Sequence, residues 1–215
     1  IVDGSEILTP PVDESNHHAP NEVALTAEAS ETGFRLNGKK GFVLEGIAAT
    51  TFVVSARSSG TPGDTNGITL FLVDGDSPGL HREFLSTADS RGYANVTFEN
   101  VEVSAEAVLG EVDAGWEALD AILDRARAGL GAEMLGGAAQ AFDMTLEYLK
   151  TREQFGQLIG SFQALGHRAA ALFTGLELAR SCTEAALQAI DEDMDDIPQM
   201  CSLAKSRMSD YLHEM

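Results

Sequence analysis

The spacing of apolar residues changes near Gly110, and this change limits the possible folds of the 215-residue chain more than any other feature. Before Gly110, apolar residues alternate with polar ones or form short runs, as in 68–73 and 95–103. Short strands that follow one another without a helical pattern between them favour an antiparallel sheet. After Gly110, apolar residues recur every three or four positions from Trp116 to Phe142, which is the period of a helix.

These two patterns predict an α+β protein with two domains. We expect residues 1–110 to form an antiparallel, β-barrel-like domain, in which residues 1–30 are an irregular leading segment. We expect residues 111–215 to form part of an up-down helical bundle. Because three helices are fewer than most such bundles contain, the bundle is expected to be incomplete in this chain. The expected helices cover about 114–152, 162–191 and 199 to the end.

Glycines give two local expectations. Asn37 and Gly38 both tolerate positive φ, so this dipeptide predicts a hairpin turn after the apolar residues that precede it. A glycine inside a helix costs about 1 kcal/mol relative to alanine. We therefore expect a neighbouring helix or subunit to pack closely against four glycines of the first helix, which are Gly129, Gly131, Gly136 and Gly137.

The charge of the chain excludes several classes of partner. The sequence has 14 Lys and Arg against 34 Asp and Glu, which gives a net charge of −20. A surface this acidic repels nucleic acid and anionic membranes, and no apolar run reaches the length of a membrane-spanning helix. The two cysteines, Cys182 and Cys201, form no CxxC motif, so a reducing cytoplasm is the expected location.

General catalytic and metal-binding motifs are missing from the sequence. His167 has no cysteine or carboxylate at metal-ligand spacing. The acidic run 191–196 has Asp196 where a calcium loop requires glycine and Ser202 where it requires glutamate. We therefore predict no metal site and interpret the acidic run as a solvated loop.

The segment that follows the first expected helix has two interpretations. The helix ends in the cations Lys150 and Arg152, which the helix dipole favours, and Phe155 and Gly156 follow before a second helix begins. One interpretation is a capped turn in which Arg152 only balances the helix dipole. The other is a ligand-binding corner, in which an arginine binds phosphate, amides bind a heterocycle and a phenylalanine stacks on it.

This segment resembles a known family. The pattern Arg152-x-Gln154-Phe155-Gly156, followed by Phe162-Gln163, is similar to a signature of the acyl-CoA dehydrogenases. Other stretches resemble the same family in the same order along the chain, which are 33–46, 48–57, 96–110, 123–127 and 204–205.

The resemblance implies a flavoenzyme with an N-terminal helical domain, a middle β domain and a C-terminal four-helix bundle. This chain would contain most of the middle domain and the first part of the bundle. Members of the family bind FAD and dehydrogenate the α,β bond of an acyl-CoA thioester in fatty acid metabolism. A glutamate takes the α-proton, the β-hydride goes to flavin N5, and electrons leave to an electron-transfer flavoprotein. A homodimer or homotetramer is the expected assembly.

The resemblance also implies positions for the binding residues. Asp124 and Arg127 would lie beside the thioester and the CoA moiety, although the same spacing also fits an ordinary ion pair one helical turn apart. Leu44 stands where relatives have a hydroxyl residue that bonds flavin N5. The residues expected at the cofactor are Phe42, Val43 and Leu44, together with Phe155 and, from the neighbouring subunit, Arg152, Gln154 and Gln163.

No residue of the chain matches the catalytic base. Most relatives have this glutamate in a C-terminal tail, and a minority have it at the position that Ala126 occupies here. Glu133 and Glu147 match neither position, so the 215 residues alone are expected to be inactive. Two alternatives remain open: a family-related oligomeric scaffold without activity, and a flavin-dependent relative of the acyl-CoA oxidase type.

Overall fold

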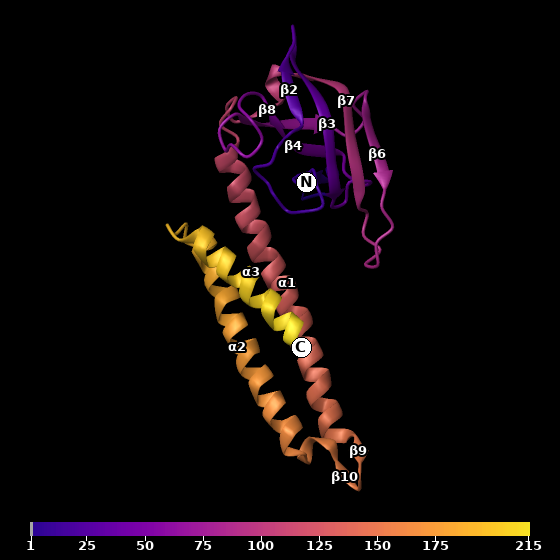
Figure 1. Ribbon diagram of the computed structural model, residues 1–215, viewed down its shortest axis with the longest axis vertical. Helices are drawn as coiled ribbons and strands as arrows, with labels where there is room; N and C mark the ends of the chain where they lie inside the picture. Colours follow the sequence, from indigo (N-terminus) through magenta and orange to yellow (C-terminus); the bar gives the residue numbers. More distant parts are fainter. Residues whose placement is uncertain (1) are drawn as a thin grey trace. The chain divides into compact units, whose positions relative to one another are not determined.

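The computed structural model describes residues 2–215 and divides into two compact units, of which the first ends at Leu119 and the second is Asp120–Met215 (Figure 1). A sheet unit followed by helices confirms the predicted α+β class. The first unit contains β1 (Leu8–Thr9), β2 (Thr26–Ala29), β3 (Gly33–Val43), β4 (Thr51–Arg57), β5 (Ile68–Asp74), β6 (Leu80–Phe84), β7 (Ala94–Ser104), η1 (Ala105–Ala107) and β8 (Val108–Leu109).

The eight strands form one sheet in the order β6-β7-β3-β2-β4-β5-β8, and β1 pairs with β4. Most neighbours are antiparallel, as predicted, but β1 and β2 both run parallel to β4. The leading segment therefore contributes to the sheet at β1 and again at β2. Between these two strands it follows an irregular path, as predicted.

Most of the buried apolar side chains of the sheet unit form one large cluster. Its largest members include Leu36, Phe52, Phe71 and Phe98, which are all fully or almost fully buried. Along β4, six consecutive residues from Phe52 to Arg57 are buried, so this strand is covered on both faces. Burial of this kind favours folding by about 1.5–3 kcal/mol for each large apolar side chain.

The predicted hairpin at Asn37 and Gly38 is wrong, because both residues lie inside the continuous strand β3. The register between β3 and β7 shifts here, which marks a β-bulge. Gly38 has φ of 146°, and a Cβ at this position would lie 2.8 Å from the Cα of Leu25. The glycine therefore permits close passage of the leading segment, which is a contact between distant parts of the sequence.

The helices are α1 (Trp116–Thr151), α2 (Gln163–Asp191) and α3 (Ile197–Glu214), and their predicted bounds are confirmed to within two residues. Within Asp120–Met215, α1, α2 and α3 alternate in direction (Figure 1). Two short strands, β9 (Glu153–Gln154) and β10 (Gln157–Leu158), and the turn η2 (Ile159–Ser161) connect α1 to α2. Every helix in residues 2–215 is too short or too polar to cross a lipid bilayer.

The helical unit has two separate apolar clusters. One surrounds Phe142 and Tyr211, and the other surrounds Cys201 and Ala204. Among the glycines of α1 and α2, the tightest contact is at Gly175, where a Cβ would lie 3.0 Å from the ring of Tyr211. Within residues 2–215, the expected close packing is not found for three of the glycines of α1, since no atom of a neighbouring element lies within 4 Å of a Cβ built at Gly129, Gly136 or Gly137.

Candidate functional site

The connection between α1 and α2, residues 152–163, forms a small hairpin that we call the corner. Gln154 pairs with Gln157 in the two-stranded ladder of β9 and β10. Phe155 and Gly156 make the turn, and both have positive φ, of 55° and 76°. This backbone is typical of a two-residue hairpin turn in which both residues have the left-handed conformation, with positive φ. The expected break between the helices is therefore an ordered hairpin.

Phe155, in this turn, has a strained backbone conformation and a side chain exposed to solvent. A bulky residue with positive φ is rare, because its Cβ crowds the following carbonyl oxygen. Its side chain is 92% exposed, and its only ring partner within the described residues is Phe162, at a centroid distance of 6.1 Å. Strain of this kind clusters at ligand-binding positions. An exposed aromatic face held in a fixed place is suited to stacking on a flat ring.

The same connection contains polar groups with the chemistry of an anion-binding site. Arg152 is exposed, and its guanidinium has no hydrogen bond or ion pair within residues 2–215. Its main chain is fixed, because the Arg152 N–H donates to the Tyr148 oxygen and its carbonyl accepts from Ile159. In a chain of net charge −20, an arginine that meets no carboxylate is free to bind an anion. Gln154 and Gln163 place exposed side-chain amides at the same corner.

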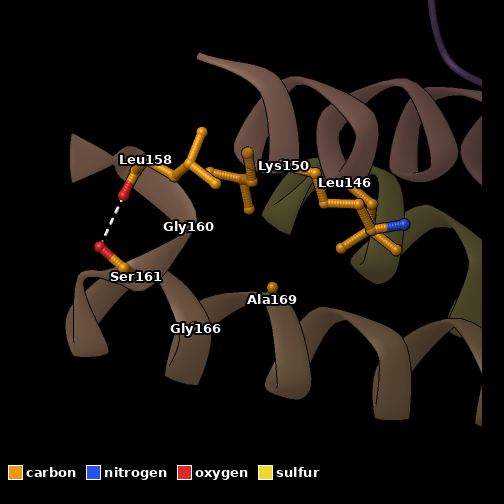
Figure 2. Close-up of a pocket in the computed structure, with 8 residues that line it drawn as sticks. Leu146, Lys150, Leu158, Gly160, Ser161, Gly166 and Ala169 are labelled. Carbon is orange, nitrogen blue, oxygen red and sulfur yellow. Dashed lines mark hydrogen bonds between the residues drawn. The ribbon is translucent and has the colours of Figure 1, made fainter. Parts of the chain in front are cut away.

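An apolar pocket of about 340 Å³ lies next to the corner, between the end of α1 and the start of α2 (Figure 2). The Ser161 hydroxyl donates to the Leu158 carbonyl at 2.6 Å and closes one side of it. Gly160 allows the chain to pass close to α1, since a Cβ there would lie 2.6 Å from the Leu149 oxygen. The lining residues are Leu146, Leu149, Lys150, Leu158, Gly160, Ser161, Gly166 and Ala169.

The predicted cofactor residues of the sheet unit lie at the end of β3 and just after it. Phe42 is 63% exposed, has φ of 49° and contacts the ring of Tyr93. Val43 is buried in the core, so only its main chain is available to a ligand. Leu44 is partly exposed and offers an apolar side chain together with its peptide group. This edge can therefore supply an aromatic surface and main-chain hydrogen bonds, but no side-chain hydroxyl.

Asp124 and Arg127 contact each other on α1, with 2.6 Å between the Asp124 Oδ1 and the Arg127 Nη1. The Asp124 side chain is almost fully buried, whereas Arg127 is partly exposed and also lies 3.9 Å from Asp120. Burial raises the pKa of the nearby Cys201 thiol, and the Asp124 carboxylate raises it further. The pair therefore presents a guanidinium to solvent and keeps its carboxylate inside the helical unit.

The corner and this ion pair lie at opposite ends of α1. Twenty-eight positions separate Asp124 from Arg152, which corresponds to about 42 Å along a helix that rises about 1.5 Å per residue. One small molecule cannot contact both groups within a single copy of the chain. The structure thus brings together the corner residues and, separately, Asp124 with Arg127.

Three polar residues beside residues 42–44 were missed by the sequence predictions. They are Thr9, Glu14 and Lys40, which are buried or partly buried next to the end of β3. One signal was available for Lys40, because it follows Leu36 at an even spacing along the strand and therefore faces inward. Its partners could not be predicted, since they come from the irregular leading segment.

The chain is an α+β protein with two parts, a sheet unit followed by antiparallel helices. At the corner it exposes a cation and an aromatic ring. These two groups are chemically suited to an anionic ligand that contains a flat ring. Residues 8–102 match the family described as acyl-CoA dehydrogenase, middle domain, and residues 113–215 match acyl-CoA dehydrogenase, C-terminal domain. The chain belongs to the acyl-CoA dehydrogenase family, as the resemblance predicted.

Individual relatives agree with this assignment. The short/branched chain specific acyl-CoA dehydrogenase of Bos taurus is 36% identical over 87% of this chain and 44% of its own length. The structure of butyryl-CoA dehydrogenase from Megasphaera elsdenii has a TM-score of 0.89 and 28% identity, and the match covers 98% of this chain and 56% of that one. An FAD complex of PigA has a TM-score of 0.91 and 27% identity, covering 99% and 56%. The chain spans less than half the length of the curated relative.

Proposed function

We propose that the protein to which this chain belongs is an FAD-dependent acyl-CoA dehydrogenase, which removes hydrogen from the α,β bond of an acyl-CoA thioester. The observation that carries this proposal is the corner, where Arg152, whose guanidinium has no partner within residues 2–215, and the strained, exposed Phe155 belong to one short hairpin connection. Family membership supplies the reaction class, and the butyryl-CoA and short/branched chain relatives support an acyl-CoA substrate.

The donor set of the chain fits FAD. A guanidinium matches a diphosphate, the Gln154 and Gln163 amides can pair with a heterocycle, and Phe155 offers a stacking surface. At the sheet edge, Phe42 and the peptide groups of Val43 and Leu44 would hold the flavin ring. When bound, FAD supplies the group that accepts the substrate β-hydride. This chain's residues would bind and orient the cofactor.

Asp124 and Arg127 are proposed to act on the substrate side. The short contact with Asp124 fixes the Arg127 guanidinium, so its remaining N–H groups can point toward the thioester or the CoA phosphates. Ala126, on the same turn, has no group that can accept a proton. We propose that a glutamate outside residues 1–215 takes the α-proton, so that these residues alone do not complete the reaction.

The separation along α1 supports a proposal about the assembly. Because about 42 Å of helix separates Arg152 from Asp124, we propose that the corner of one copy contacts FAD held by the sheet edge of another copy. A homodimer is the smallest assembly that satisfies this requirement, and a homotetramer satisfies it twice. An electron-transfer flavoprotein is the proposed electron acceptor.

Absorbance of the purified full-length protein tests the proposal. We expect a flavin spectrum that bleaches when acyl-CoA is added without oxygen. Bound flavin that does not bleach with acyl-CoA of any chain length would refute the dehydrogenase and favour the scaffold. Rapid reoxidation by oxygen alone would favour the oxidase-type alternative.

The corner itself is tested with an arginine variant and a matched control. Arg152→Gln should weaken FAD binding by about 10- to 100-fold, which is the effect of losing a hydrogen bond to a charged group. Arg180→Gln is the control, because Arg180 is also exposed on the helical unit but pairs with Glu177 at 3.2 Å. Equal FAD affinity in the two variants would contradict a cofactor role for Arg152.

A further inference from the structure

The end of β3 has an irregular backbone where the proposed flavin edge begins. Gly41 and Phe42 together stand opposite the single residue Asn95 of β7, so β3 bulges at this point. Phe42 has positive φ, which is unfavourable for a bulky residue. Such a conformation persists only where surrounding contacts determine it. The contacts that hold residues 41–44 therefore decide how this edge is presented.

The leading segment supplies contacts on both sides of the bulge. The Gly41 N–H donates to the Asp13 carbonyl at 2.7 Å. The Thr9 hydroxyl donates to the Leu44 carbonyl, also at 2.7 Å, and Thr9 is almost fully buried. On the far side, the Phe42 N–H donates to the Asn95 side-chain oxygen at 3.4 Å. Residues 9–14 thus bracket residues 41–44 through two short hydrogen bonds.

A buried ion pair fastens the leading segment to β3. Lys40 is completely buried, and its Nζ donates to the Glu14 Oε1 at 2.7 Å and to the Ser55 hydroxyl at 3.0 Å. The same nitrogen donates to the Val12 carbonyl at 3.3 Å. The Glu14 carboxylate also accepts the Ala24 N–H at 2.8 Å. A lysine buried this deeply is tolerated because its charge is paired and its N–H groups are bonded.

We propose that residues 9–14 are a clamp that sets the conformation of the flavin edge, residues 41–44, and that the Lys40–Glu14 pair fastens this clamp. Thr9, Glu14 and Lys40 are then positioning residues, which act on the cofactor through the Gly41 and Leu44 peptide groups. The inference rests on the proposed flavin site at residues 42–44. It assigns these three side chains a task that the Phe42, Val43 and Leu44 side chains cannot perform.

Two sets of substitutions in the full-length protein separate positioning from stability. Thr9→Val keeps the branched shape and removes only the hydroxyl that bonds Leu44. The double variant Lys40→Met and Glu14→Gln removes both charges, so neither is left buried alone, and the glutamine oxygen can still accept the Ala24 N–H. Thr69→Val is the matched control, because Thr69 is equally buried and its hydroxyl oxygen accepts the Asp113 N–H at 2.8 Å, away from residues 41–44.

Two measurements are made on each variant: hydrogen exchange of peptides covering residues 41–46 after FAD has been removed, and the dissociation constant for added FAD. We expect faster exchange in Thr9→Val and in the double variant, with FAD bound about tenfold more weakly, as for one lost hydrogen bond. Thr69→Val should change neither quantity. If the double variant does not fold, Thr9→Val decides the question.

The outcomes distinguish the clamp from the proposed function. If the wild-type protein binds FAD but Thr9→Val and the double variant exchange and bind as it does, the clamp is refuted and the flavin enzyme stands. Weaker FAD binding without faster exchange would assign Thr9 a direct ligand contact and would also refute the clamp. A wild-type protein without affinity for FAD refutes both.

Discussion

Phe71 and Phe173 are both phenylalanines, but their surroundings differ. Phe71, on β5, is fully buried and meets Phe34 edge to face at a centroid distance of 5.1 Å. Phe173, on α2, is 53% exposed, and its ring lies 6.2 Å from that of Phe142. The difference extends to the two units as a whole. The sheet unit has one large cluster of buried apolar side chains, whereas the helical unit has two smaller clusters.

The helical unit also leaves more of its large apolar side chains in contact with solvent within this chain. Phe155 and Leu158 belong to the corner hairpin and Met194 to the connection between α2 and α3, but the others lie along regular helices. They include Met144, Tyr148, Phe173, Leu178 and Leu203. The comparison indicates that the sheet unit obtains its stability from its own core. Surfaces of α1, α2 and α3 remain available for contacts of the kind that the proposed assembly requires.

The comparison predicts its largest effect for the two phenylalanines. Phe71→Ala should lower the free energy of unfolding by about 3–5 kcal/mol, because it leaves a cavity in a closed core. Phe173→Ala should change it by about 0.5 kcal/mol or less in the 215-residue chain, as for other surface positions. Urea unfolding of both variants measures the difference. Similar losses would show that the helical unit is packed as completely as the sheet unit.

A second prediction compares two ion pairs on α1. Asp124→Asn should cost about 1–3 kcal/mol, because it weakens a hydrogen bond whose carboxylate is buried. Glu147→Gln breaks the Lys150–Glu147 pair, which has the same spacing but is exposed, and should cost at most about 0.5 kcal/mol. Thermal or urea unfolding checks the ranking. If both variants lose the same stability, the burial of Asp124 has no energetic role.

The smallest effect is expected at the surface of the sheet unit. Arg35 joins β3 to β7 by donating to Glu102 at 2.7 Å, and this hydrogen bond lowers the pKa of Glu102 below its ordinary value of 4.5. The carboxylate thus stays ionised in the fold to lower pH than in the unfolded chain. Its contribution is present above pH 4.5 and is lost as the pH falls through the lowered pKa.

Arg35→Gln removes this contribution, so its stability deficit relative to wild type should be small at neutral pH and should vanish in acid. The deficit should also shrink in high salt, since both side chains are exposed. Chemical unfolding at a series of pH values is the measurement. A deficit that stays constant with pH would show that Arg35 acts through packing and not through the Glu102 charge.

The features that could be predicted from the sequence are those that depend on nearby residues. The helical period between Trp116 and Phe142 is local, so the bounds of α1 were predicted closely. The corner was recognised because Arg152, Gln154 and Phe155 lie within one short motif, although its hairpin form was not predicted. The pairing of Asp124 with Arg127 follows from a spacing of three residues on a helix.

The features that were missed depend on contacts between distant residues. Gly38 was interpreted as a turn residue, but its role is to let Leu25 pass close to β3. Lys40 meets Glu14 across 26 positions of the sequence, in a segment without a regular period. Val43 faces the core because the bulge at Gly41 reverses the alternation of the strand. None of these contacts has a signature in the order of the residues alone.

The distance between the two ends of α1 has a genetic consequence. If the corner of one copy completes the site of another, Arg152 and Asp124 of a given site come from different chains. Coexpression of an Arg152 variant with an Asp124 variant would then give mixed assemblies in which some sites contain neither substitution. Two alleles that are each inactive would restore activity to one another, and the fraction restored would report how the copies are arranged.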